Sequence, residues 1–218
     1  LGRKSIRAEI EESLKRLGTD YIDLYQTHWQ ESTTPIEETM RELVKLKEEG
    51  KIRAIGVSNA TVEQVERYRT VGDVDSDQER YSMLDRWIET DLLDHTDAYG
   101  TGVIVFSPLE QGLLSSKYLD PKNPIPENTR AADPDGYLQP EQVTVEKVQQ
   151  ARKLNELARQ RDQSLVQMAL AWTLCDPRIT SAIIGARTPE QITECAAAIN
   201  NTEFSEQELS VIDTIAPR

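Results

Sequence analysis

Apolar and polar positions follow two periods along this chain, and the changes of period mark its predicted elements. Apolar residues recur every three or four positions over Leu1–Arg16, which predicts a helix. Tyr21–Thr27 instead alternates and is rich in β-favouring residues, which predicts a strand. The same reasoning predicts strands at Lys51–Val57, Gly102–Phe106 and Ile179–Ile184, and helices at Thr34–Glu49, after Thr61, at Trp87–Tyr99, Glu146–Gln160, Ser164–Leu174, after Thr188 and after Ser205. The segment Ser76–Tyr81 has little apolar surface, and the alternation of elements, more than its own pattern, predicts a strand there.

Helix starts of the capping-box type support this division. A capping residue is followed within three positions by Glu or Gln at Thr34–Glu37, Thr61–Gln64, Thr188–Gln191 and Ser205–Glu208. Ser107–Val143, in contrast, is rich in proline, glycine and polar residues and includes PKNPIPENTRAADPDGYLQP. A segment this long without regular structure is usually functional or mobile.

Strands that alternate with helices predict parallel βα units. The chain has five such strands, whereas a complete βα barrel has eight strands and about 250 residues. We therefore expect an α/β fold of the (β/α)8 TIM-barrel type, present here as the last five βα units and a C-terminal helix. Residues 1–218 would form one domain that lacks its N-terminal strands. The lack of these strands has three alternative explanations. The chain is a fragment, it is a natural truncation, or it associates with another copy that covers the exposed sheet edges.

The composition of the chain disfavours several classes of binding partner and site. The 218 residues carry a formal net charge of −13, which disfavours nucleic acid and anionic membrane surfaces. Cys175 and Cys195 are too few for a disulfide framework or a zinc site. The chain has no apolar run of the roughly 18 residues that a membrane span needs. We expect a cytoplasmic protein.

The carboxyl ends of the predicted strands carry polar and aromatic residues. In a parallel βα barrel these ends form the functional face. They include no metal-ligand cluster, no Cys–His pair and no paired carboxylates, so hydrolysis is poorly supported. GARTPEQ places Arg187 before a helix start, where an anion is favoured, although Arg187 alone could be a solvated surface charge. The strand ends are His28, Ser58-Asn59, Gln78 with Tyr81, Phe106-Ser107 and Gly185-Ala186-Arg187.

Five spaced motifs together resemble the aldo-keto reductase superfamily. They occur in order across the chain: YIDLYQTHW, GKIRAIGVSN, QERYSMLDR, FSPLEQGLLSSKY and IIGARTPEQITE. The resemblance implies an eight-stranded βα barrel in which a hydride passes from NADPH to a carbonyl group.

The resemblance also implies roles for the strand-end residues. His28 matches the catalytic histidine, which donates to the substrate carbonyl oxygen, although a lone histidine of this kind could also be a core residue. Ser58, Asn59 and Gln78 match the residues that hold the nicotinamide carboxamide. Phe106 matches the aromatic that stacks on the nicotinamide ring, with plain barrel core as the alternative.

The remaining cofactor positions lie in the second half of the chain. Ser107, Leu109, Gly112 and Lys117 match the loop along the pyrophosphate, where amides and one cation suit the charge. At the last strand end, Gly185 belongs to the cofactor-binding set. Arg187 and Gln191 match contacts to the 2′-phosphate and adenine, and Glu194 matches an acidic position near the adenine amine. Cys195 departs from the usual asparagine.

The aspartate, tyrosine and lysine of the family's catalytic tetrad have no counterparts that we can assign. Tyr25 and Tyr81 lack a neighbouring lysine at matching spacing. The leading hypothesis is an NADPH-dependent reductase of aldehydes or ketones, or the cofactor-binding portion of one. The alternative is a non-catalytic NADPH-binding regulatory module that resembles potassium-channel β subunits. The sequence does not identify the small carbonyl substrate.

Overall fold

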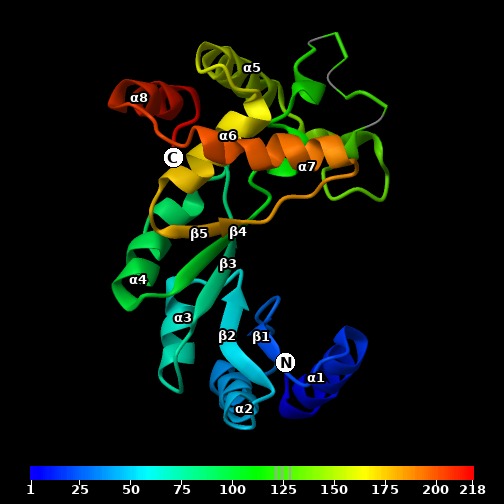
Figure 1. Cartoon of the computed structure of the whole chain (residues 1–218), viewed down its shortest axis with the longest axis vertical. Coiled ribbons are helices and arrows are strands. Elements are labelled where there is room, and N and C mark those ends of the chain that lie inside the picture. Colours follow the sequence, from blue (N-terminus) through cyan, green and yellow to red (C-terminus); the bar gives the residue numbers. More distant parts are fainter. Residues whose placement is uncertain (121, 124, 128) are drawn as a thin grey trace. The chain divides into compact units, whose positions relative to one another are not determined.

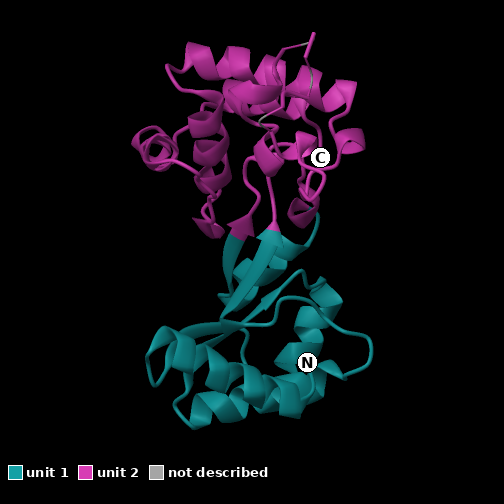
Figure 2. Ribbon diagram, turned by 90° about the vertical axis from the view of Figure 1, so that its right-hand side faces the viewer, with its two compact units in different colours: residues 1–79, 90–104 teal, residues 80–89, 105–218 magenta. Residues whose placement is uncertain are grey.

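The computed structural model describes residues 1–120, 122–123, 125–127 and 129–218. The long segment predicted at Ser107–Val143 is therefore described only in part, because Pro121, Pro124 and Asn128 lie outside the described residues. The chain forms two compact units (Figure 2): unit 1 comprises residues 1–79 and 90–104, and unit 2 comprises residues 80–89 and 105–218. The expectation of one domain over residues 1–218 stays a prediction.

Helices and strands alternate as the sequence predicts (Figure 1). All five predicted strands are confirmed. Among the described residues they lie in the order β1-β2-β3-β4-β5, which does not close into a barrel. The strands are β1 (Ile22–Gln26), β2 (Ile52–Ser58), β3 (Ser76–Arg80), β4 (Gly102–Phe106) and β5 (Ile179–Ala182). The helices are α1 (Arg3–Leu17), α2 (Ile36–Glu48), α3 (Val62–Arg69), α4 (Leu92–Tyr99), α5 (Val145–Gln160), α6 (Leu165–Cys175), α7 (Pro189–Ala196) and α8 (Glu206–Ile215).

The register of β1, β2 and β3 sets where the polar strand ends meet. Both strand pairs are parallel, and Ser58 of β2 lies opposite Gln78 of β3. Two residues earlier, Gly56 lies opposite Ser76, and a Cβ on Gly56 would come within 2.5 Å of the Ser76 hydroxyl oxygen. Glycine is therefore required for this close approach.

Unit 1 has an apolar core between its helices and strands. The side chains of α1, α2 and α3 that recur at helical spacing are buried against β2, and removal of this surface from water supplies about 25 cal/mol per Å2. The fully or almost fully buried members include Ile10, Met40, Leu43, Leu46, Ile55, Val57, Val65 and Tyr68.

Unit 2 has separate apolar clusters. One lies under the loop after β4 and contains Leu113, Tyr118, Ala131 and Leu138. Another joins α6 to α7 and contains Leu170, Cys195 and Ala198. Cys195 is therefore a packed side chain of α7. Among the described residues, no helix combines the length and apolar character needed to cross a membrane.

Two local predictions are wrong. The single helix predicted at Trp87–Tyr99 is a 3-10 turn at Trp87–Glu89 followed by α4, because Asp91 leaves helical geometry. The predicted capping box at Thr34–Glu37 is also absent: α2 begins at Ile36, and the cap position is occupied by Pro35, which has no N–H to donate to a glutamate carboxylate.

Two other helix starts agree with the sequence, and a third agrees in part. Capping boxes are present at Thr61–Gln64 and Ser205–Glu208. At α7 the Thr188 hydroxyl accepts from the Gln191 amide as predicted. The Gln191 side chain, however, accepts from the Arg187 amide at 2.7 Å. In a complete capping box the Gln191 side chain would accept from the Thr188 amide, but here it accepts from the Arg187 amide instead.

Candidate functional site

The ends of β2 and β3 form a hydrogen-bonded group within unit 1. The Ser58 hydroxyl donates to the Gln78 carbonyl oxygen at 2.7 Å, and the Asn59 amide N–H donates to the same oxygen at 3.1 Å. The Asn59 side-chain amide in turn donates to the Ser58 hydroxyl oxygen at 2.9 Å. Three residues predicted to hold one carboxamide are therefore brought together.

His28 follows β1 and is linked to this group. Its carbonyl oxygen accepts from the Asn59 side chain at 3.1 Å, so its backbone position depends on Asn59. The imidazole is exposed, which argues against the alternative of a core histidine. Trp29, 59% exposed, lies beside it with 6.1 Å between the ring centroids. An exposed donor next to an exposed aromatic can contact a small ligand.

Asn59 has an uncommon backbone conformation. Its φ is 54°, in the left-handed region that few residues other than glycine enter, although asparagine tolerates it better than most. The strain is local and must be held by the surrounding contacts. The neighbouring amide, that of Ala60, donates at 2.8 Å to the buried carboxyl of Glu79.

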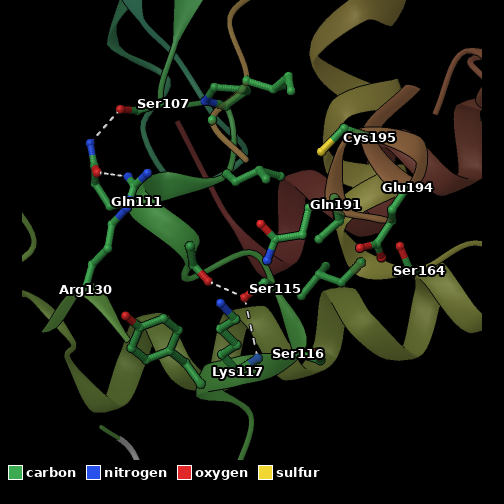
Figure 3. A pocket seen from close by; sticks show the side chains of 18 of the residues that line it. Ser107, Gln111, Ser115, Ser116, Lys117, Arg130, Ser164, Gln191, Glu194 and Cys195 are labelled. Atoms are coloured by element: carbon green, nitrogen blue, oxygen red, sulfur yellow. Dashed lines mark hydrogen bonds between the residues drawn. The ribbon is translucent and has the colours of Figure 1, made fainter. Parts of the chain in front are cut away.

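Unit 2 contains a cavity of about 480 Å3. Its walls come from the ends of β4 and β5, the loop after β4, the start of α7, and α5 and α6, and Figure 3 shows the side chains facing it. All nine cofactor residues that the sequence predicts in this unit line the cavity: Phe106, Ser107, Leu109, Gly112, Lys117, Gly185, Arg187, Gln191 and Glu194. Such a volume is in the ordinary range for small-molecule sites.

Cations dominate the ionisable groups of this cavity. Among the described residues that line it, Lys117, Arg130, Arg159 and Arg187 are basic and Glu194 is the one acidic side chain. In a chain with a net charge of −13, this local excess of positive charge favours an anionic ligand. Arg187 is exposed and lies on the cavity wall, where it can contact a ligand as well as solvent.

Sequence reasoning missed Arg130 and Arg159. Arg130 lies in the polar segment after β4, and Arg159 lies on α5, which ends far in sequence from any predicted strand end. The signal for Arg130 was weak, a lone cation within a proline-rich segment. For Arg159 we find no sequence signal, because only the packing of α5 brings it to the cavity wall.

The loop after β4 has an unusual backbone. Ser107, Glu110 and Gln111 have φ values of 56°, 46° and 57°, and Gly112 has a φ of 102°. The Gln111 side-chain amide donates to the Ser107 hydroxyl oxygen at 2.7 Å, and Arg130 donates to the Gln111 carbonyl oxygen (Figure 3). This chain of contacts runs along one wall of the cavity and fixes the loop in its conformation.

Glu110 anchors this loop from behind. It is 1% exposed, and its carboxylate accepts from Arg80 and Lys147, both at 2.8 Å, and from the Ser82 hydroxyl at 3.2 Å. Burial opposes ionisation, but the hydrogen bond from Lys147 and the charge of Arg80 outweigh it, so the pKa of Glu110 is lowered. The loop is therefore tied to a charged, fully paired carboxylate.

Tyr25 and Tyr81 offer no replacement for the unassigned tetrad tyrosine. The Tyr81 hydroxyl donates to the Glu89 carboxylate at 2.7 Å, and its ring stacks on Trp172. Burial and the Glu89 charge raise the pKa of Tyr81, and burial also raises that of Tyr25. A tyrosine that releases its proton readily needs a lowered pKa, so both have the wrong environment. Among the described residues no group of His, Cys, Asp or Glu could hold a metal ion.

Comparison with known proteins supports the resemblance noted in the sequence. The L-glyceraldehyde 3-phosphate reductase of Escherichia coli (strain K12) is 38% identical over 97% of this chain and 63% of its own length. The NADH-specific methylglyoxal reductase of the same organism is 39% identical over 92% of this chain and 61% of its own length. The structure of a glycerol dehydrogenase from Gluconobacter oxydans is similar, with a TM-score of 0.86 and 30% identity over 100% of this chain and 66% of that one.

These matches cover almost all of this chain but only part of each relative. The chain spans slightly less than two thirds of the length of the relatives described above. The Aldo/keto reductase family matches residues 1–217, which is almost the whole chain. The five-stranded parallel α/β fold, the cavity lined by the predicted strand-end residues and this match lead to one conclusion: the chain belongs to the aldo/keto reductase family.

Proposed function

We propose that this chain is an NADPH-dependent oxidoreductase that reduces aldehydes or ketones to alcohols, or the cofactor-binding portion of one. The observation that carries the proposal is the cavity of unit 2, where nine predicted cofactor residues meet and four cations face one carboxylate. Relatives named as reductases of glyceraldehyde 3-phosphate and methylglyoxal support a small carbonyl compound as substrate.

The donor set of the cavity fits a phosphorylated dinucleotide. Lys117 and the amides of the loop after β4 would hold the pyrophosphate. Arg187, whose amide is fixed by Gln191, would pair with the 2′-phosphate through its forked guanidinium. Glu194 would accept from the adenine amine. Arg130 and Arg159 add positive charge to the same cavity, beyond what the sequence predicts.

Other predicted cofactor residues lie at strand ends of each unit. In unit 2, Phe106 offers a flat apolar ring on which a nicotinamide can stack. In unit 1, Ser58, Asn59 and Gln78 offer hydrogen-bonding groups that match a carboxamide. When bound, NADPH supplies a hydride to the carbonyl carbon. His28 would donate an N–H to the carbonyl oxygen as negative charge develops there. The proton that completes the alcohol is assigned to no residue of this chain.

Cofactor choice rests on Arg187. One relative is NADH-specific by name, so family membership alone does not decide between NADPH and NADH. An arginine at the start of α7 favours NADPH, because it offers a charged partner to a 2′-phosphate that NADH lacks.

The test is fluorescence titration of this chain with NADPH and with NADH. We expect NADPH to bind more tightly, and Arg187→Ala to weaken NADPH binding by about 10- to 100-fold, which corresponds to a lost charged hydrogen bond. NADH binding should change little. Arg16→Ala, which removes an exposed arginine from α1, is the matched control. Equal affinities of the unmodified chain for both nucleotides would contradict NADPH selectivity.

Turnover is tested separately, with a panel of small aldehydes and the product of the complete gene. Cofactor oxidation that depends on aldehyde would support the reductase. NADPH binding without turnover of any aldehyde would favour the alternative of a regulatory NADPH-binding module. Absence of both would overturn the proposal.

A further inference from the structure

Two buried acids flank Gln78 on β3. Asp77 is 0% exposed and Glu79 is 1% exposed, and because side chains alternate along a strand they share the face opposite to that of Gln78. In the part of the chain that the structure describes, no lysine or arginine forms an ion pair with either acid. Two carboxyl groups are thus buried together directly behind a residue of the candidate site.

This pair requires a proton. Asp77 and Glu79 are buried next to each other on one face of the strand, and two ionised carboxylates in that position would repel each other with no cation between them. Burial, together with the neighbouring Asp77, raises the pKa of Glu79 to about 9, and burial raises that of Asp77 to about 6. At neutral pH the pair therefore holds one proton, which resides on Glu79.

Three further groups face the pair from the elements packed against it. His95 of α4 acts electrostatically on Asp77, while its Nε2 contacts Glu66 of α3. Tyr68 of α3 also lies near Asp77, and burial raises the pKa of this tyrosine. None of these groups forms an ion pair with Glu79. The Glu79 carboxyl is therefore stable in its buried position because it is protonated.

The protonated carboxyl still has an acceptor oxygen, and that oxygen is used. Glu79 Oε1 accepts from the Ala60 amide at 2.8 Å, while the Asn59 amide donates to the Gln78 carbonyl oxygen at 3.1 Å. Two consecutive amides of the β2–α3 corner are thus bound to two consecutive residues of β3. Between these bonds Asn59 adopts its left-handed φ of 54°.

We propose that Glu79 is a positioning residue: through the Ala60 amide it holds Asn59 in the left-handed conformation that directs the Asn59 side chain towards Ser58 and the nicotinamide carboxamide. This inference rests on the proposed function. It assigns to a buried acid, which touches neither substrate nor cofactor, control over the residues of unit 1 that would hold the nicotinamide carboxamide. The cavity of unit 2 should not depend on it.

The experiment compares Glu79→Ala and Glu79→Gln. Glutamine keeps the contact with Ala60, because its side-chain carbonyl oxygen can accept from that amide and the side chain is uncharged, whereas alanine removes the contact. We expect Glu79→Ala to weaken NADPH binding by about tenfold or more, the usual effect of an unsatisfied buried group, and Glu79→Gln to stay within about threefold. Glu42→Ala, which removes another buried glutamate from unit 1, is the matched control.

A second ligand separates positioning from loss of the fold. Adenosine 2′,5′-bisphosphate has the adenosine and 2′-phosphate groups but no nicotinamide. Its affinity should be unchanged in Glu79→Ala. Equal weakening of both ligands, or equal NADPH affinity of Glu79→Ala and the unmodified chain, would overturn the inference. If the unmodified chain binds neither ligand, the proposed function fails, and the next measurement decides the inference alone.

That measurement needs no ligand. In 1H–15N spectra of the unmodified chain, the Ala60 amide resonance should titrate with a midpoint near the pKa of Glu79, about 9, because its acceptor loses a proton there. The titration should be absent in Glu79→Gln. An Ala60 resonance that does not respond between pH 7 and 10 would contradict the shared proton and the contact that carries the inference.

Discussion

Glu79 in unit 1 and Glu110 in unit 2 are both 1% exposed, and each lies behind a strained loop of the candidate site, yet their environments are opposite. Glu110 accepts from Arg80 and Lys147, and its pKa is lowered. Glu79 has Asp77 as its partner, and its pKa is raised to about 9. Equal burial therefore does not decide ionisation. The sign of the neighbouring charge does.

The two glutamates stabilise their units over opposite pH ranges. The folded pKa of Glu79 lies above its unfolded value, so its contribution is complete at low pH and is lost as the pH rises towards about 9. The folded pKa of Glu110 lies below its unfolded value, so its contribution is present at neutral pH. That contribution is lost as the pH falls below the ordinary value of 4.5.

The largest expected effect tests Glu110, the ionised glutamate of the comparison. Glu110→Ala leaves Arg80 and Lys147 without their shared carboxylate and removes the anchor of the loop after β4. Removal of one partner from a buried ion pair costs about 3–5 kcal/mol of unfolding free energy. Urea unfolding measures it, with Glu141→Ala, an exposed glutamate of the same unit, as control. A loss below about 1 kcal/mol would show that Glu110 is not a structural anchor.

The second-largest expected effect tests Glu79, the protonated glutamate of the comparison. Between pH 6 and 9 the folded chain holds a proton on Glu79 that the unfolded chain has released. The unfolding free energy should therefore fall by about 1.4 kcal/mol per pH unit relative to Glu79→Gln, which cannot titrate. Urea unfolding at several pH values measures this difference. Parallel pH profiles of the two proteins would show that Glu79 is ionised in the folded state.

The comparison also shows how far sequence reasoning reaches. Alternation of elements and the positions of strand ends were predictable, because periodicity and capping residues act locally. The nine residues of unit 2 to which the family resemblance gives a role in cofactor binding line one cavity. Arg159 escaped prediction because its place on the cavity wall depends on how α5 packs, which no local pattern of the helix encodes.

The burial of Asp77 and Glu79 was also not predicted, for a different reason. SDQER is polar and has little apolar surface, so the alternation of strands and helices, more than its own pattern, predicts a strand at Ser76–Tyr81. The strand forms because a shared proton and the Ala60 amide satisfy the buried carboxyl of Glu79. A hydropathy pattern treats every carboxyl as charged and exposed. Protonation state and backbone partners become visible only when the strands are assembled.

The smallest expected effect separates the two causes that raise the pKa of Glu79. Asp77→Asn removes the neighbouring charge but retains burial, which is the larger cause. The midpoint of the Ala60 amide titration should therefore move below about 9 but stay above the ordinary glutamate value of 4.5. The same 1H–15N titration measures it, with Glu66→Gln as a control for charge changes near His95. An unchanged midpoint would assign the whole shift to burial, whereas a fall to the ordinary value would assign it to Asp77. In that second case the two buried glutamates would differ by neighbouring charge alone.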